Sequence, residues 1–430
     1  MTRLLKDVFS VSASKVLMTV FGLATSIIIA RSLGPEKNGV IAALLVYPSL
    51  FISFGSLGVR QSTVYFLGKK IYTEKEIKTA ITQIWFFTSI ISVLSCFCLI
   101  SYFSNEGEDI WLVLLAISPI TFNLFNTYNT GIFLGRNDVA SFSKVNWIPS
   151  FVILFLTVIC VLVLKLDIKG YFFALIGGPM VVSLILFNKN KFLSFFTLNF
   201  NWLIIKKMIS LGVVYALGLL IVNLNLRVDV ILLDKLSTPY EVGIYSKGTS
   251  LAEYLLQVPL FLSAIIFARS AVAKNDKLFS VKITQLLRLS SMITIIGSVV
   301  LLLLSNYIIL GLFGADFFES GRVLKFLTPG ILFLTIFTVL NMDIAGKGKP
   351  WLAVKAMVPA LIINIILNLV LIPDYGSSGA ALSSTFSYFI ASLLFLILYS
   401  RETKIPIKQI IMIKKTDFIV FKDLIKKLKQ

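Results

Sequence analysis

Long apolar segments fill most of this chain and limit the folds that it can adopt. A helix needs about 20 apolar residues to cross a bilayer, and the runs here are continuous rather than alternating, which excludes a membrane β-barrel. We place the segments near 11–31, 39–67, 78–103, 110–133, 145–165, 170–188, 208–233, 241–268, 284–312, 322–345, 351–372 and 377–399. The pattern predicts an all-α membrane protein with twelve transmembrane helices.

Composition narrows the chemistry that such a bundle can perform. The chain is 57% hydrophobic and only 14% charged, and it contains no histidine. Triads, metal ligands and proton relays that depend on histidine are therefore excluded. The longest loop, 189–207, is too short to form a soluble domain. We expect a membrane transporter, not an enzyme, with no metal and no cofactor.

Basic residues predict which side of the membrane each loop faces. The even-numbered loops and the N-terminus hold 18 Lys and Arg residues, the tail after 400 holds nine, and the odd-numbered loops hold seven. Cytoplasmic loops are enriched in Lys and Arg. Both termini are therefore predicted to be cytoplasmic in a multi-pass bacterial inner-membrane protein. Contact with anionic lipid explains the net charge of +19, so nucleic-acid binding is not needed.

Two short sequence patterns recur six spans apart. Pro35 and Gly39 introduce the second span as Pro239 and Gly243 introduce the eighth, and the pair Gly135-Arg136 corresponds to Gly346-Lys347. An even spacing makes corresponding helices parallel, as in lobes related by a two-fold axis along the membrane normal. We predict two six-helix lobes in a parallel pseudo-two-fold repeat. Their limits are 1–190 and 208–400, with a cytoplasmic linker over 191–207 and a basic amphipathic tail over 401–430.

Charged residues inside the apolar segments are the strongest functional signal. Arg227 lies in a segment otherwise apolar enough to span, and an intramembrane charge costs at least about 2.5–3.5 kcal/mol unless it finds a partner or water. Arg60, Arg227 and Glu253 lie deepest, whereas Arg288 is expected to extend toward the interface. The six basic residues in the spans are Lys15, Arg60, Arg227, Lys247, Arg288 and Lys355, and the three acidic ones are Asp229, Glu253 and Asp343. The interior is net positive, which favours an anionic substrate.

Polar residues follow helical spacing in several spans. In the second span, Ser49, Ser53, Ser56, Arg60 and Thr63 share one face of a continuous helix. Such stripes either line a cavity or pack helices together, and both interpretations stay open.

The seventh and fourth spans carry further polar groups. Asn223 and Arg227 share a face of the seventh span, while Asn225 and Asp229 lie about 200° away, so an Arg227–Asp229 salt bridge is not expected. The fourth span offers Asn123 and Asn126.

Three stretches resemble a known family. They are IIIARSLGPEKNGVIAALL near the N-terminus, LRVDVILLDKLSTPYEVGIYSKG in the middle, and AGKGKPWLAVKAMVPALIINIILNLVLIPDYGSSGAALSS near the C-terminus. With the twelve-span layout, the sequence resembles the polysaccharide-biosynthesis oligosaccharide flippases of the multidrug/oligosaccharidyl-lipid/polysaccharide (MOP) exporter superfamily. The resemblance implies alternating access that moves an undecaprenyl-pyrophosphate-linked oligosaccharide, an O-antigen or capsule repeat unit, from the cytoplasmic to the outer leaflet.

The resemblance also implies roles for the polar residues. Glu253 and Asp229 become candidates for coupling to a proton or sodium gradient. Candidates for binding the anionic headgroup are Arg60, Arg227, Lys15 and Lys247, and candidates for lining the sugar path are Ser53, Ser56, Asn123, Asn126 and Asn223. Expected partners are the lipid-linked oligosaccharide, anionic membrane lipid, the ion gradient and other polysaccharide-assembly membrane proteins.

Two other classes remain as alternatives. A MATE-like drug or cation antiporter of the same superfamily would be expected to line its cavity with acidic residues. A membrane enzyme of polysaccharide assembly would be expected to carry a large periplasmic loop, which this sequence lacks.

Overall fold

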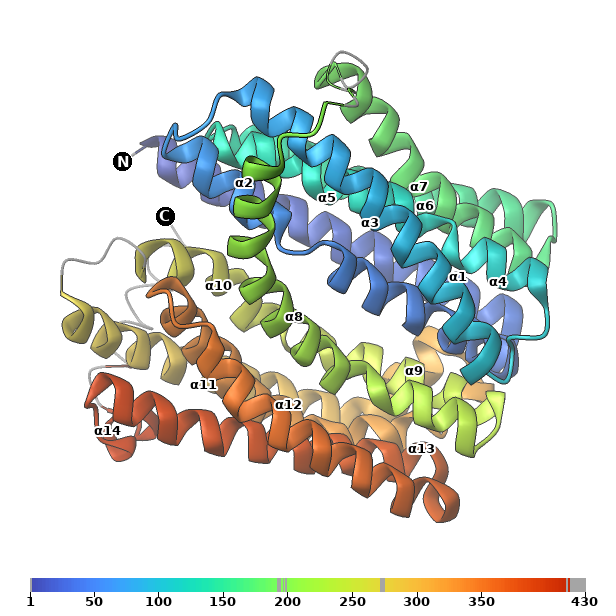
Figure 1. Ribbon diagram of the computed structural model, residues 1–430. Coiled ribbons are helices and arrows are strands. Elements are labelled where there is room, and N and C mark those ends of the chain that lie inside the picture. The colour runs from blue at the N-terminus through green and yellow to red at the C-terminus, as the bar shows by residue number, and fades with distance from the viewer. Residues whose placement is uncertain are drawn as a thin grey trace. The chain divides into compact units, whose positions relative to one another are not determined.

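The computed structural model describes residues 2–191, 195, 197, 199–270, 275–414 and 417, and for 2–9, 264, 265 and 268 the backbone only. These residues form helices joined by short connections, with no strand among them (Figure 1). The helices of the first half are α1 (Thr2–Gly55), α2 (Val59–Gly68), α3 (Glu74–Phe103), α4 (Ile110–Ile117), α5 (Pro119–Gly135), α6 (Val139–Thr157) with a π-helical continuation over Val158–Val163, and α7 (Asp167–Lys189). Those of the second half are α8 (Trp202–Leu236), α9 (Pro239–Tyr254), α10 (Gln257–Ser270), α11 (Asp276–Phe313), α12 (Ser320–Gly346), α13 (Trp351–Thr403) and α14 (Ile407–Ile411), with a 3-10 turn over Ala315–Phe317.

Nine helical segments in the described part of the chain are long and apolar enough to cross a membrane. The protein is therefore a multi-pass membrane protein. The two longest of the nine, Ser10–Gly68 and Trp351–Thr403, are long enough for two crossings, and each contains a glycine with positive φ, Gly34 (φ 73°) and Gly376 (φ 52°). Glycine adopts this conformation without a Cβ penalty. The two glycines coincide with the predicted breaks between the first and second spans and between the eleventh and twelfth.

The eighth predicted span consists of two helices, α9 and α10. Pro259 explains the break, because its ring clashes with the carbonyl of the residue four positions earlier, which is Leu255. The backbone there follows tighter three-residue bonds, from the Leu255 amide to Ala252 and from the Leu256 amide to Glu253. Glu253 therefore lies in the last turn of α9, next to a discontinuity.

The second predicted span is also interrupted, so the prediction of a continuous helical face through it is wrong. α1 ends at Gly55 and α2 begins at Val59, with positive φ at Leu57 (43°) and Gly58 (61°). A Cβ on Gly58 would lie 2.1 Å from the carbonyl oxygen of Gly212 on α8, so this close backbone approach requires glycine. The face that carries Ser49 and Ser53 therefore does not continue to Arg60.

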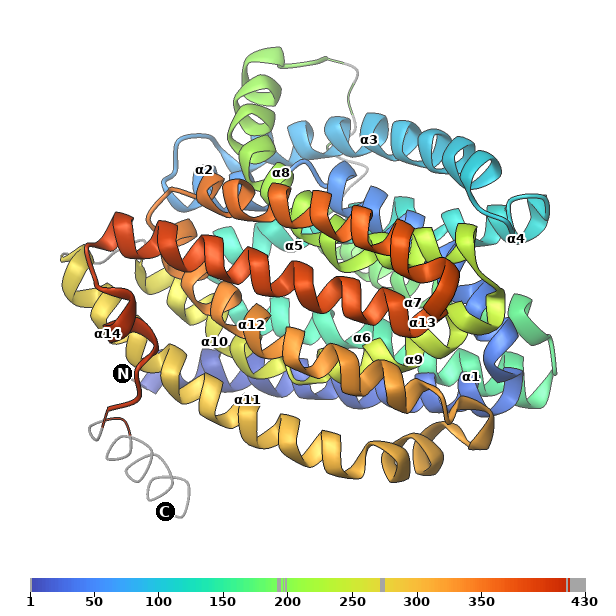
Figure 2. The ribbon, with the colours of Figure 1, turned by 90° about the horizontal axis from the view of Figure 1, so that it is seen from below.

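The chain divides into two compact units, and the division falls inside α8. The first unit comprises residues 1–223 and 237–243, and the second comprises 224–236 and 244–430. In the first, α6 packs against both α1 and α7, and α5 lies between α2 and α7. In the second, α12 packs against α10, α11 and α13, the yellow to red helices of Figure 2.

A buried arginine organises one end of the second unit. Arg288 of α11 is 5% exposed, and its guanidinium binds both carboxylate oxygens of Asp417 at 2.7 and 3.1 Å. It also donates to the carbonyls of Gln409 at 2.9 Å and Ile410 at 3.4 Å. The expectation that Arg288 extends toward the interface is therefore wrong, because a carboxylate beyond the last span and two carbonyls of α14 bind its guanidinium within the fold.

A buried carboxylate joins four helices of the same unit. Asp343 of α12 is fully buried and accepts hydrogen bonds from Ser270 of α10, Ser280 of α11 and Tyr399 of α13, at 2.6 to 2.8 Å. Lys347 supplies the countercharge at 3.0 Å. Asp343 is thus a structural centre. Half of the predicted amphipathic tail over 401–430, namely residues 415, 416 and 418–430, lies outside the described residues.

Candidate transport site

An ion pair joins α8 and α9 in the second unit. Arg227 pairs with Glu253 through its two terminal guanidinium nitrogens: Nη2 donates a hydrogen bond to Oε2 at 3.3 Å, and Nη1 lies 3.2 Å from Oε1. The Arg227 side chain is 38% exposed and that of Glu253 25% exposed. As the helical spacing predicted, Arg227 does not pair with Asp229. Its acidic partner is Glu253, on the neighbouring helix.

Asp229 occupies a different, fully buried environment in the same unit. Its carboxylate accepts hydrogen bonds from Tyr245 of α9 at 2.8 Å, from Asn368 of α13 at 2.7 Å, and from Ser384 of α13. Within the described residues no lysine or arginine pairs with it. The partners of this carboxylate in the described part of the chain are thus neutral hydrogen-bond donors.

Unused polar atoms lie beside this carboxylate. Asn368 hydrogen-bonds to Asn364, yet its own Oδ1 and the Nδ2 of Asn364 are buried without a partner in the described structure. Most buried polar atoms in proteins are paired. Carboxylate, amide and hydroxyl oxygens are suitable ligands for a hard cation, so the residues around Asp229 fit a small cation or a proton.

One predicted site residue of the first unit, Arg60, lies just after the break between α1 and α2. Its backbone packs closely against Gly131 of α5, where an added Cβ would lie 3.2 Å from the Arg60 carbonyl. The side chain is half-buried, and within the described part of the chain it forms no hydrogen bond or ion pair. Arg60 therefore keeps its guanidinium available.

Several residues predicted to line the sugar path form hydrogen bonds within the first unit. Asn223 donates to the Ser53 hydroxyl at 2.7 Å, and Ser56 donates to the Ser53 carbonyl at 2.8 Å. Asn126 donates to the carbonyl of Pro179 at 2.8 Å and accepts from Ser183, and Asn123 donates to its own helix. These bonds tie α5 to α7 and α8 to α1, and a role in sugar binding stays a prediction.

The two remaining basic candidates differ in environment. Lys15 is half-buried on α1. Lys247 on α9 is buried, and its ammonium lies 5.7 Å from the ring centroid of Phe313. Cation–π contact of this kind stabilises a buried ammonium. A role for either lysine in headgroup binding also stays a prediction.

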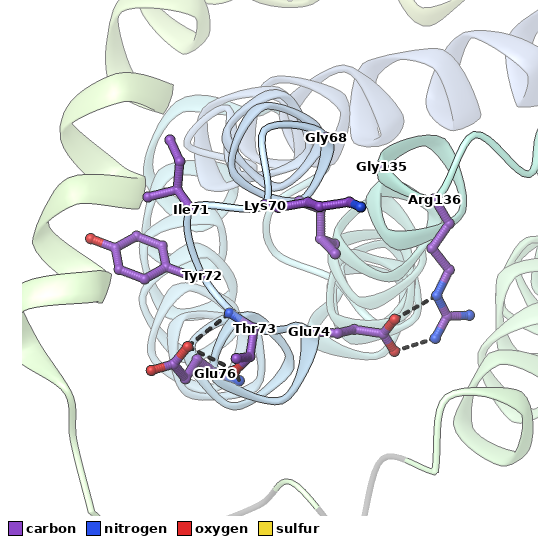
Figure 3. Close-up of a pocket in the computed structure, with 10 residues that line it drawn as sticks. Gly68, Lys70, Ile71, Tyr72, Thr73, Glu74, Glu76, Gly135 and Arg136 are labelled. Atoms are coloured by element: carbon purple, nitrogen blue, oxygen red, sulfur yellow. Dashed lines mark hydrogen bonds and ion pairs between the residues drawn. The ribbon is translucent and has the colours of Figure 1, made fainter.

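A surface pocket of about 550 Å³ lies elsewhere in the first unit, between the loop after α2 and the end of α5 (Figure 3). Glu74 and Arg136 face each other across one side of it and form a bidentate ion pair, with Nε 2.7 Å from Oε2. This hydrogen bond raises the pKa of Arg136. Lys78 pairs with the same carboxylate at 2.9 Å. The wall is thus charge-balanced, and it contains none of the predicted site residues.

Sequence reasoning missed the donors around Asp229. Asn364 and Asn368 stand four residues apart in an otherwise apolar span, a spacing that places both on one helical face. Two asparagines at that spacing were a usable signal, whereas Tyr245 and Ser384 gave none.

Comparison with known proteins identifies the fold first. The structure is similar to the lipid II flippase MurJ in an inward closed conformation, with a TM-score of 0.74, 19% identity, and coverage of 93% of this chain and 88% of that one. It is equally similar to an inward-facing multidrug resistance MATE transporter of the MOP superfamily, with a TM-score of 0.75, 15% identity, and coverage of 90% and 94%. The chain therefore has the MOP transporter fold.

The sequence identifies the family. A family model described as "Polysaccharide biosynthesis protein" matches residues 28–321, and the chain belongs to that family. CapF of Staphylococcus aureus, a capsular polysaccharide biosynthesis protein, is 28% identical over 202 residues, which is 46% of this chain and 50% of that protein. Agl15 of Haloferax volcanii, a probable glycan biosynthesis flippase, is 23% identical over 169 residues, covering 39% and 36%. The chain thus spans half or less of the length of these curated relatives. The resemblance to polysaccharide flippases of the MOP superfamily is confirmed.

Proposed function

We propose that this protein is a flippase that moves an undecaprenyl-pyrophosphate-linked oligosaccharide from the cytoplasmic to the outer leaflet. The observation that carries the proposal is Arg227, an arginine held within a membrane-spanning helix and left 38% exposed. Charged residues within membrane-spanning helices are rare and commonly mark a substrate or ion path. Guanidinium pairs bidentately with phosphoryl oxygens, which suits a pyrophosphate. Family membership and the relation to CapF and Agl15 support an oligosaccharide as the cargo.

The proposed architecture is twelve spans in two parallel lobes, with limits of 1–190 and 208–400, both termini cytoplasmic, in the bacterial inner membrane. Splitting the two long segments at Gly34 and Gly376, and joining α9 to α10 as one interrupted span, gives this number. The two copies of the first repeat motif contact each other reciprocally within the first unit. A Cβ on Gly39 would lie 1.7 Å from the Pro239 carbonyl oxygen, and one on Gly243 would lie 2.0 Å from that of Pro35.

The second repeated motif has matching chemistry in each unit. Arg136, after Gly135, pairs with Glu74 at the start of α3. Lys347, after Gly346, pairs with Asp343 and donates to Ser280 near the start of α11. In each half, the basic residue that follows the glycine thus forms polar contacts near the start of an earlier helix, α3 or α11. This correspondence supports the parallel repeat and transport by alternating access.

Ion coupling is proposed to run through the two carboxylates of the second unit. Asp229 is fully buried, is satisfied by neutral donors, and lies beside unused amide atoms. In a site of this kind, a proton or a sodium ion binds to the carboxylate in place of those neutral donors. Glu253, held less tightly, is the second candidate.

The test is surface display in a host that depends on this protein for its polysaccharide. We expect Arg60→Ala or Arg227→Ala to abolish display while the protein still reaches the membrane, because each removes a phosphate-binding group. Arg322→Ala, an exposed position on α12, is the matched control and should display normally. Full display in both site variants would reject the basic site.

Proton and sodium coupling can be distinguished in the same host. Display should stop under only one of two treatments. One treatment collapses the proton gradient with an ionophore, and the other replaces external sodium by choline. If neither treatment lowers display at constant protein level, the coupling proposal fails and the flippase proposal stands.

A further inference from the structure

Two arginine–carboxylate pairs in the second unit differ in a way that suggests different roles. The Arg288–Asp417 pair is buried on both sides, has contacts as short as 2.7 Å, and is supported by backbone carbonyls. The Arg227–Glu253 pair has contacts of 3.2 and 3.3 Å, and both partners are partly exposed. Charge-assisted hydrogen bonds are ordinarily about 2.7–2.9 Å long. The second pair is therefore loose.

No further hydrogen bond holds the Arg227 guanidinium within the described residues. Most of the affinity of a partly exposed pair is lost to solvation and side-chain entropy, so such pairs contribute little to stability. A pair that contributes little to the fold can be separated at small cost. The geometry is that of a pair that opens, rather than one that holds two helices together.

The backbone around Glu253 is also suited to movement. Glu253 precedes the break between α9 and α10, where Leu255 and Leu256 leave the regular helical bonding pattern. Interrupted membrane helices commonly carry the substrate and ion sites of transporters, because the break frees backbone groups and lets the flanking segments shift. A carboxylate in the last turn before such a break can change partners without unwinding a whole helix.

Several titratable side chains lie within electrostatic range of the Arg227–Glu253 pair. Tyr388 of α13 lies within electrostatic range of both Arg227 and Glu253, Tyr245 of α9 lies within range of Arg227, and Tyr254 lies within range of Glu253. Tyr388 and Tyr245 are 1% exposed. Asp229 lies within electrostatic range of the same Tyr388 and Tyr245. Separating Arg227 from Glu253 therefore leaves each of these two groups without its ion-pair partner.

Resting on the function proposed above, we propose that Glu253 is a displaceable counter-ion of Arg227. In the empty transporter the Glu253 carboxylate is paired with the Arg227 guanidinium. An entering pyrophosphate headgroup takes over the N–H donors of Arg227, and the released Glu253 carboxylate binds one proton or one sodium ion from the side on which the headgroup enters. When the headgroup leaves, the cation leaves and the pair re-forms. Substrate binding and cation uptake are thereby linked at one carboxylate.

This linkage has a definite sign. Ionised Glu253 competes with the anion for Arg227, so whatever neutralises Glu253 strengthens anion binding. By reciprocity, bound anion strengthens cation binding by the same factor. Removing the competitor should tighten anion binding by roughly three- to tenfold, the range set by a partly exposed ion pair.

The experiment measures binding of inorganic pyrophosphate to the purified full-length protein in detergent by isothermal titration calorimetry. Wild type is compared with Glu253→Gln, which keeps the shape and removes the charge, and with Glu253→Ala. Glu319→Gln, at an exposed position immediately before α12, is the matched control. Titrations are run from pH 5.5 to 8.5 and in sodium or choline chloride, and the comparison with the control cancels the titration of pyrophosphate itself.

We expect the Glu253→Gln and Glu253→Ala proteins to bind pyrophosphate more tightly than wild type at pH 8.5, and to lose the additional dependence on pH or sodium that wild type shows. Arg227→Gln should weaken binding strongly in either background. Equal or weaker binding in both Glu253 variants, or an unchanged response to pH and sodium, overturns the proposal. So does an absence of pyrophosphate binding in wild type and both variants.

Failure of this inference is distinguishable from failure of the proposed function. Wild-type protein that flips lipid-linked oligosaccharide in vesicles, with pyrophosphate affinity unchanged by Glu253→Gln, rejects the counter-ion and keeps the flippase. Wild-type protein that binds pyrophosphate with the expected competition but flips no such lipid rejects the flippase as proposed. Size-exclusion profiles that match wild type show that each variant is folded.

Discussion

Substituting Arg288 by methionine should release the end of the chain without unfolding the bundle. The guanidinium binds both oxygens of the Asp417 carboxylate and the carbonyls of Gln409 and Ile410. Breaking a buried ion pair costs about 3–5 kcal/mol, because one charge is left without a partner. Asp417 lies beyond the last membrane helix, so the chain can avoid this cost by letting the segment after α13 detach.

The expected increase in detachment is calculated from the lower end of this range of free-energy costs. About 3 kcal/mol corresponds to more than 100-fold in an equilibrium constant, so the detached population should rise by roughly that factor. Cleavage by a protease follows the population of the open form when opening is fast. Trypsin should therefore cut after Lys408 or Lys414 far faster in Arg288→Met than in wild type, whereas the melting temperature of the bundle should change little.

A matched control variant tests whether the faster cleavage is specific to Arg288. Arg401→Met alters an exposed arginine at the end of α13, and its cleavage at Lys408 and Lys414 should match wild type. Mass spectrometry of timed digests in detergent gives the rates. If Arg288→Met is cleaved no faster than Arg401→Met, the pair does not hold this segment. If its melting temperature falls sharply, the pair supports the whole bundle instead.

Three further predictions follow from other contacts. The Arg288 hydrogen bonds lower the pKa of Asp417, so this contribution to tail docking is present above the ordinary Asp pKa and is lost as pH falls through the lowered value; tryptic protection, measured at neutral pH after acid pulses with rapid quenching, should decline only in strong acid. Gly243→Ala places a Cβ 2.0 Å from a backbone oxygen and should cost about 1–3 kcal/mol by overpacking, seen as a lower melting temperature, whereas Gly22→Ala, with nothing within 4 Å, should not. Asp229→Asn should remove the dependence of the melting temperature on sodium or proton concentration, since a ligand at 100 times its Kd stabilises by about 2.7 kcal/mol; a response equal to that of wild type would reject Asp229 as the ion site.

Span positions could be predicted well because they depend on local composition. Runs of apolar residues and the Gly34 and Gly376 breaks are properties of short stretches, and the bilayer sets their length. The interruptions after Gly55 and after Tyr254 were not predicted. The first depends on a close approach to α8, which no local pattern encodes, while the second could have been inferred from Pro259 and its clash with Leu255.

Partners of the charged residues were harder to predict than their positions. Helical geometry correctly separated Arg227 from Asp229, because both lie on one helix and the period of 3.6 residues fixes their angle. It could not show that Glu253 pairs with Arg227, since the register between two helices depends on packing. Arg288 is paired with a residue 129 positions away, beyond the bundle, and its expected exposure was wrong for that reason.

The central claim is that this protein moves a pyrophosphate-linked oligosaccharide across the bilayer, and that Arg60 and Arg227 are each needed for this transport. The direct measurement is flipping in reconstituted vesicles of an undecaprenyl-pyrophosphate oligosaccharide with a fluorophore on the sugar, scored by the fraction that external dithionite bleaches under an imposed ion gradient. Wild-type protein should make more of the label accessible than empty vesicles, Arg322→Ala should match it, and Arg60→Ala and Arg227→Ala should fall to the rate of empty vesicles. Flipping at the wild-type rate by both site variants, or no flipping by wild type under either a proton or a sodium gradient, would contradict the claim.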